Sequence, residues 1–138
     1  MKYSSYMLFL LAVAMTSFAA CGDEGTDYLE SLTAAIEVSR PSSARANEPV
    51  SIDLTVFGSS GCSEFSRFTT TVVGDTTFFQ LYQKRDQEAV CTTQIIEIEA
   101  SIEVSFDAAG TKFLKFNEPS TLFSDQESVI LKEITITP

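Results

Sequence analysis

With 138 residues, the chain has room for one sandwich-sized domain and little more. Its 19 acidic and 9 basic residues give a formal charge of −10, which disfavours nucleic acid and anionic lipid surfaces as partners because both are bound through lysine and arginine. The chain has no histidine, so it lacks the commonest general base, the commonest zinc ligand and the usual serine–histidine and cysteine–histidine pairs. We therefore expect a protein that is not an enzyme and that has no cofactor and no metal site.

Residues 1–20 have the organisation of an export signal. Lys2 is followed by an apolar run over residues 7–15, which is too short to cross a membrane as a helix. This pattern predicts the charged and apolar regions of a signal peptide.

A lipidation motif follows the apolar run. Ala19, Ala20 and Cys21 match the lipobox, so the segment resembles the signal peptides of bacterial lipoproteins. Phe18 stands where that family usually has leucine, and residues 17–19 also fit an ordinary signal peptidase site. The resemblance implies cleavage before the cysteine, diacylglycerol on its sulfur, and a lipid-anchored protein of the cell envelope, in the outer membrane and facing either the periplasm or the cell surface.

Residues 21–33 begin as an acidic, glycine-containing segment. Such a composition is typical of a flexible tether between an anchored cysteine and a folded domain. Acidic residues directly after a lipidated cysteine also resemble sorting signals for outer-membrane or surface display. We expect a tether over this range and one folded domain over residues 34–138.

In the expected domain, apolar and polar residues alternate with a period of two, as in strands that have one buried and one solvated face. Seven segments show this pattern: 34–39, 50–56, 67–73, 76–83, 96–106, 111–117 and 128–137. They predict an all-β fold, a seven-stranded immunoglobulin-like antiparallel β-sandwich. We expect the first, second and fifth segments in one sheet and the other four in the second sheet.

The third and fourth segments are separated by only Gly74 and Asp75, which favours a hairpin with a type II′ turn. This turn fixes the register, with Val73 opposite Thr76. Three further pairs then share the face that we expect to point toward the core: Phe68 with Leu81, Thr70 with Phe79, and Val72 with Thr77.

Residues 109–116 resemble the penultimate strand of bacterial immunoglobulin-like domains, which has tyrosine where this chain has Lys112. The resemblance extends to small immunoglobulin-like lipoproteins of Gram-negative bacteria through further short matches at residues 48–50, 61–62, 65–68 and 90–92. It implies the sandwich fold but no agreed activity. We expect the Lys112 amine to extend toward water from a half-buried position.

Cys62 and Cys91 remain as a pair once Cys21 is lipidated. In an oxidising compartment such a pair favours a disulfide over two free thiols. Thiol catalysis is not expected, because the chain has no histidine to activate either sulfur.

Glu97, Glu99 and Glu103 lie on one side of the segment over residues 96–106. Paired carboxylates occur in glycosidases and in calcium sites. However, same-face neighbours on a strand are about 7 Å apart, and no glycine-rich loop of oxygen ligands surrounds these residues. We interpret them as a solvated acidic face.

The hairpin register also predicts an outward face. Phe78 and Tyr82 lie on it beside Thr69 and Thr71, and the alternation of the 111–117 strand adds Phe113. Exposed aromatic side chains on a threonine-rich sheet are typical of a binding surface. The alternative is that the tether or the loop around residue 123 covers them.

Together these patterns predict a non-enzymatic envelope lipoprotein that acts as a binding or adhesion accessory. Its expected partners are the membrane, through the lipid anchor, and a protein, peptide or glycan at the aromatic face. The alternative is a structural subunit of an envelope assembly, packed permanently against a partner through the same face or through a free strand edge.

Overall fold

The computed structural model describes residues 27–119 and 128–138, which contain nine β-strands and no α-helix. The strands are β1 (Tyr28–Thr33), β2 (Ala35–Ser39), β3 (Ser43–Arg45), β4 (Val50–Gly58), β5 (Glu64–Val73), β6 (Thr76–Asp86), β7 (Ile96–Val104), β8 (Gly110–Asn117) and β9 (Val129–Thr137). Within the described ranges, no helix is long and apolar enough to cross a membrane. The predicted signal peptide and Cys21 lie outside the described residues.

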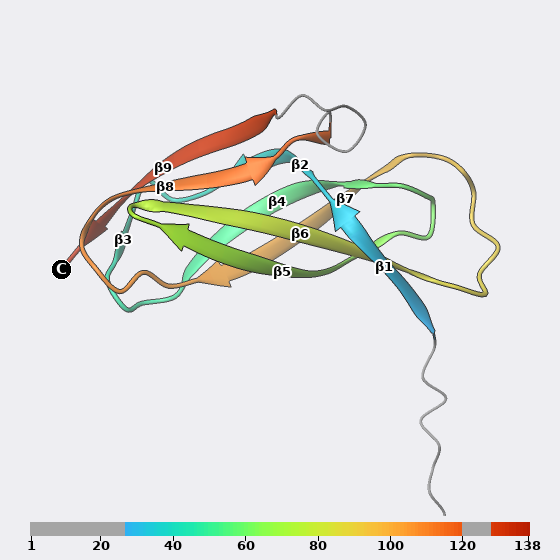
Figure 1. Cartoon of the computed structure of the whole chain (residues 1–138), viewed down its shortest axis with the longest axis horizontal. Coiled ribbons are helices and arrows are strands. Elements are labelled where there is room, and N and C mark those ends of the chain that lie inside the picture. The colour runs from blue at the N-terminus through green and yellow to red at the C-terminus, as the bar shows by residue number, and fades with distance from the viewer. Residues whose placement is uncertain (1–26, 120–127) are drawn as a thin grey trace, which may run out of the picture.

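The strands form two sheets that pack face to face (Figure 1). One sheet has three strands in the order β2-β4-β7, and the other has six strands in the order β1-β6-β8-β9-β3, with β5 also paired to β6. The predicted all-β sandwich and its division of strands between the sheets are confirmed. Two pairings, β3 with β9 and β6 with β8, are parallel, and the others are antiparallel.

The core lies between the sheets, where the inward-facing apolar side chains of one sheet pack against those of the other. Phe79 and Phe116 stack with ring centroids 4.4 Å apart near its centre. The largest fully buried side chains come from both sheets: Phe116, Ile52, Leu81, Leu114, Ile134 and Val56. Burial of these side chains supplies the main stabilisation of the fold.

The expected tether differs from the structure at its C-terminal end. Tyr28–Thr33 form β1, which pairs antiparallel with the second half of β6. The Thr33 hydroxyl donates a hydrogen bond to the Phe57 carbonyl of β4, so the end of β1 also contacts the other sheet. β1 and the short β3 account for the two strands beyond the predicted seven.

The hairpin register is confirmed at all four predicted pairs. Gly74 has a φ of 61°, while Asn47 is the one non-glycine residue with positive φ in the described ranges, so the turn fits the predicted type II′ geometry. Val72 nevertheless differs from expectation. It lies on the inner side of β5 but is 66% exposed, because the three-stranded sheet does not cover this end of the hairpin.

Strict alternation over residues 34–39 predicts that Ile36 points inward together with Ala34 and Val38. A β-bulge between Ala35 and Glu37 shifts the register of β2, and Ile36 is 39% exposed as a result. Both Ala34 and Ala35 are buried instead.

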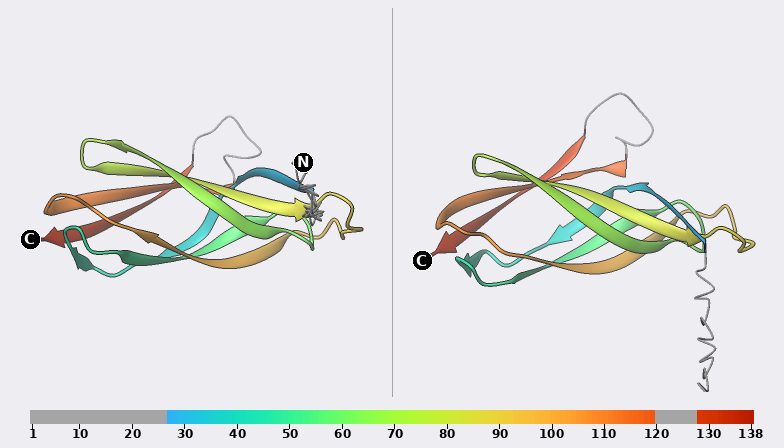
Figure 2. Two further views of the ribbon diagram at one scale, coloured as in Figure 1. Left: turned by 90° about the horizontal axis from the view of Figure 1, so that it is seen from below. Right: turned by 60° about the horizontal axis from the view of Figure 1, so that its bottom comes forward.

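The two ends of the sandwich carry different features (Figure 2). The N-terminal end of the described chain lies beside the connection after β6, where the Gln87 amide donates to the Asp27 carbonyl at 2.9 Å. The C-terminus and the β5–β6 turn lie at the opposite end. We refer to these as the N-terminal end and the hairpin end.

Candidate binding surface

The outer face of the six-stranded sheet is organised around β6. Its outward residues are Thr76, Phe78, Gln80, Tyr82 and Lys84. One edge of β6 pairs with β5, and the other edge pairs with β8 along its first half and with β1 along its second half. Side chains far apart in sequence therefore become neighbours on one surface.

This arrangement brings the predicted patch residues onto one face. Phe78 lies between Thr71 of β5 and Lys115 of β8, and Phe113 is opposite Thr76. Tyr82 occupies the same side two rows further along β6. Thr69 is on the same side of β5, opposite Gln80, to which its hydroxyl donates at 3.4 Å.

The aromatic side chains are less exposed than the prediction requires. Phe78, Tyr82 and Phe113 are each half-buried, whereas Thr69 and Thr71 are exposed. The expectation of a fully exposed aromatic patch is therefore corrected, because each of the three aromatic side chains is only partly accessible.

Cations cover three aromatic rings on this face. The Arg67 guanidinium lies 3.9 Å from the centroid of the Tyr82 ring, and the Lys84 amine lies 4.7 Å from that of Tyr28. The Lys115 amine lies 5.1 Å from the centroid of Phe78. Each contact is of the cation–π type, which contributes about 0.5–1 kcal/mol at exposed sites. We call these six residues the cation–aromatic face: Tyr28, Arg67, Phe78, Tyr82, Lys84 and Lys115.

Glu30 of β1 orients Arg67. Its carboxylate accepts hydrogen bonds from Arg67 Nη2 at 2.8 Å and from Ser66 Oγ at 2.6 Å. The hydrogen bond from Arg67, and to a lesser extent the one from Ser66, holds the pKa of the Glu30 carboxyl below its ordinary value of 4.5. The hydrogen bond to Glu30 in turn raises the pKa of Arg67. The guanidinium is thus fixed between the Tyr82 ring and a carboxylate.

The sequence pattern missed three exposed apolar residues of this face. Tyr28 and Leu32 of β1 are 53% and 51% exposed, and Leu131 of β9 is 59% exposed. Tyr28, Glu30 and Leu32 do occupy alternate positions, but a single short segment next to a glycine-rich stretch gives too weak a signal to predict a strand. Leu32 lies opposite Tyr82, so part of the expected tether does pack beside the patch.

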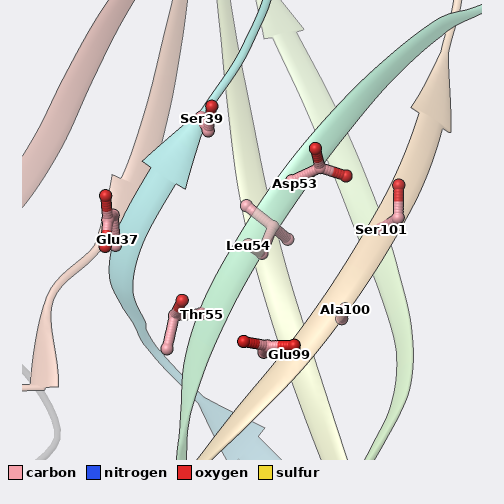
Figure 3. A pocket seen from close by; sticks show the side chains of 8 residues that line it. All are labelled: Glu37, Ser39, Asp53, Leu54, Thr55, Glu99, Ala100 and Ser101. Atoms are coloured by element: carbon pink, nitrogen blue, oxygen red, sulfur yellow. The ribbon is translucent and has the colours of Figure 1, made fainter.

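The outer face of the three-stranded sheet has the opposite character. Its three strands contain five carboxylates and no lysine or arginine: Glu37, Asp53, Glu97, Glu99 and Glu103. A shallow hollow of about 530 Å³ lies on this face, with Glu37, Asp53 and Glu99 each contributed by a different strand (Figure 3).

The carboxylates in this hollow are kept apart by hydroxyl side chains. One cross-strand row is Glu37, Thr55 and Glu99, and the next has Asp53 between two serines. Glu37 and Glu99 are separated by two strand spacings, about 10 Å. No group of three or more potential metal ligands occurs in the described part of the chain. The geometry agrees with a solvated acidic face.

Cys62 and Cys91 form the predicted disulfide, with Cα atoms 5.4 Å apart. It links the connection after β4 to the connection after β6 at the N-terminal end.

Lys112, at the hairpin end, contacts the Asp75 carboxylate at 2.7 Å and is only 14% exposed. Its amine therefore forms an ion pair with the carboxylate of the β5–β6 turn.

The fold and this surface define a small two-sheet β-sandwich. The family model of the ORF11 beta-sandwich domain matches residues 52–124, more than half of the chain, and the chain belongs to this family. The matched range includes all of β5, β6, β7 and β8, and therefore strands of both sheets. Comparisons with curated proteins and with solved structures give no match.

Proposed function

We propose that this protein is a non-enzymatic lipoprotein of the cell envelope, anchored through Cys21, that uses the outer face of its six-stranded sheet as a binding or adhesion surface. The ligand is a protein, peptide or glycan that carries carboxylate groups. Because the described chain begins at Asp27, at the N-terminal end of the sandwich, an anchor at Cys21 would leave the hairpin end farther from the membrane.

One observation carries the proposal. In a chain of net charge −10, three cations are held on aromatic rings on one face, beside exposed Tyr28, Leu32 and Leu131. Aromatic and arginine side chains are enriched in protein interfaces, and apolar side chains that remain exposed together on one face favour a partner. The cations favour carboxylates on that partner.

A matched pair of substitutions tests the surface. Leu131→Asp places a charge on the proposed face, and Ile95→Asp makes the same change at a site of similar exposure outside it, 61% against 59%. Both variants should stay within about 0.5 kcal/mol of the parent in stability. Capture of the partner from envelope extract should fall more than tenfold for Leu131→Asp only. Equal capture by both variants would refute this surface.

The anchor has a separate test. Cys21→Ala should abolish labelling with a fatty-acid analogue and release the protein from the membrane fraction, because stable attachment needs the acyl chains. Retention in the membrane fraction without labelling would rule out the lipid anchor while leaving the binding surface untouched.

The second candidate is a structural subunit of an envelope assembly. It is favoured by the free edges of β5 and β7, since in the described ranges each of these strands pairs with only one neighbour. Gentle detergent extraction distinguishes the two functions: a stoichiometric complex indicates a subunit, and a freely extracted monomer indicates a binding module.

A further inference from the structure

One long side of the sandwich is open between the sheets. β5 is an edge strand of the six-stranded sheet, and β7 is an edge strand of the three-stranded sheet. Side chains of both strands line a hollow of about 670 Å³, with Phe65 and Phe68 on one wall and Ile102 and Glu103 on the other. An edge strand offers unpaired amide and carbonyl groups to any extended chain that lies beside it.

A second cavity, of about 550 Å³, opens on the same side at the hairpin end. Its apolar walls come from the inner faces of β5 and β7 and from the connection after β7: Phe68, Val72, Val104 and Phe106. Val72 is 66% exposed there, whereas Phe79 and Leu81 on the same face of the hairpin are each 2% exposed. The inner face of β5 is thus only partly covered by the chain itself.

The rim that β7 contributes to this side is acidic, whereas Arg67 and Lys112 line the two cavities from the six-stranded sheet. Glu97, Glu99 and Glu103 alternate along the outer face of β7 and are all exposed. A strand added to the free edge of β7 would set its own outward side chains beside these carboxylates. Opposite charges in such cross-strand pairs are stabilising and like charges are destabilising, so the added strand should be basic. A second copy of this chain fits poorly, because each copy has a charge of −10.

We propose that this open side binds an extended basic segment of a protein partner, which adds a strand to the free edge of β7 and places apolar side chains in the cavity beside Val72. The segment alternates apolar residues with lysine or arginine. This mode of recognition combines backbone hydrogen bonds with pockets for every second side chain. The site borders the cation–aromatic face, because Arg67 lines the hollow between β5 and β7, but it does not depend on the function proposed for that face.

A synthetic peptide tests the site directly. The probe is a peptide of about ten residues that alternates valine with lysine and carries one tryptophan at a valine position. The chain itself has no tryptophan, so the fluorescence reports the peptide alone. On titration with the full chain, the emission should shift to the blue as the indole enters the cavity. A peptide of the same composition without alternation, and one with glutamate for lysine, should each bind at least tenfold more weakly.

Neighbouring valines provide a matched pair of variants. Val72 faces the cavity and Val73 faces the outer side of the sheet, with exposures of 66% and 63%. Val72→Ser should weaken the alternating peptide about tenfold, because it removes one apolar contact, and Val73→Ser should leave binding unchanged.

Charge reversal supplies the second pair. E97K/E103K changes the rim of β7, and E37K/D53K makes the same change in net charge on β2 and β4. The first should weaken binding about tenfold, and the second less than threefold. Equal effects of the two double variants would show binding to net charge only and would overturn the proposal. Dimerisation in sedimentation experiments without peptide binding would assign the edge to a second copy and would also overturn it. Leu131→Asp should not change binding of this peptide. The experiments therefore distinguish failure of the open-side site from failure of the cation–aromatic face.

Discussion

Arg67 connects two strands and an aromatic ring through one side chain. Its guanidinium lies over Tyr82 while its Nη2 donates to Glu30 of β1, which lies 37 residues earlier in the chain. Neither contact follows from the sequence, because Glu30 falls in a segment without clear periodicity. The hairpin register predicts the position of Tyr82 correctly, but not the cation that covers it.

Titration of Glu30 tests this arrangement. Since the folded state lowers the pKa of this carboxyl, its stabilising effect is present above the ordinary value of 4.5 and is lost as the pH falls through the lower folded value. In Arg67→Gln, the pKa of Glu30 measured by NMR should rise toward 4.5. An unchanged titration midpoint in this variant would contradict the ion pair.

Packing of two phenylalanines on β8 tests the assignment of faces. Phe116 is fully buried and stacks on Phe79, while Phe113 is half-buried on the outer side. Phe116→Ala should lower the free energy of unfolding by about 3–5 kcal/mol. Phe113→Ala should cost about 1–2 kcal/mol, because less apolar area is lost. Urea unfolding curves measure both values, and equal losses would mean that the faces are misassigned.

At the scale of elements, local signals predict some features and tertiary contacts decide others. The Gly74-Asp75 turn and the alternation around it predict the β5–β6 register as far as Arg67, because a two-residue loop permits few geometries; a bulge between Phe65 and Arg67 shifts the register beyond that point. β1 has no such local signal, and its strand conformation depends on pairing with β6. The bulge in β2 is likewise set by its partner strand β4, so the exposure of Ile36 could not be predicted from alternation.

The disulfide joins two connections that have no regular structure of their own. Cys62 and Cys91 are separated by 29 positions, and in the chain-entropy model a bridge over a loop of that size stabilises the fold by about 3–4 kcal/mol. The C62S/C91S variant should lose this amount in urea unfolding experiments. A reducing agent should destabilise the parent and leave the variant unchanged; equal stability of parent and variant would contradict the bridge.

At the scale of the whole molecule, the two outer faces differ in charge. The three-stranded sheet presents five carboxylates and no cation, whereas the six-stranded sheet holds Arg67, Lys84 and Lys115 on aromatic rings beside carboxylates such as Glu30 and Glu133. The net charge of −10 is visible in the composition, but its unequal distribution appears only when the strands are assembled into sheets. The fold class and the disulfide follow from local pattern and composition, while the shape of the candidate surface depends on which strands pair.

Site-specific photo-crosslinking in intact cells tests most directly whether the outer face of the six-stranded sheet is the contact surface. A photoreactive phenylalanine analogue is placed at Thr71 or Leu131 on this face, and at Glu37 or Asp53 on the acidic face, away from the free edge of β7; all four positions are exposed. The account predicts one discrete adduct from Thr71 and Leu131 and none from Glu37 and Asp53. Adducts from the acidic positions with none from Thr71 or Leu131 would contradict it.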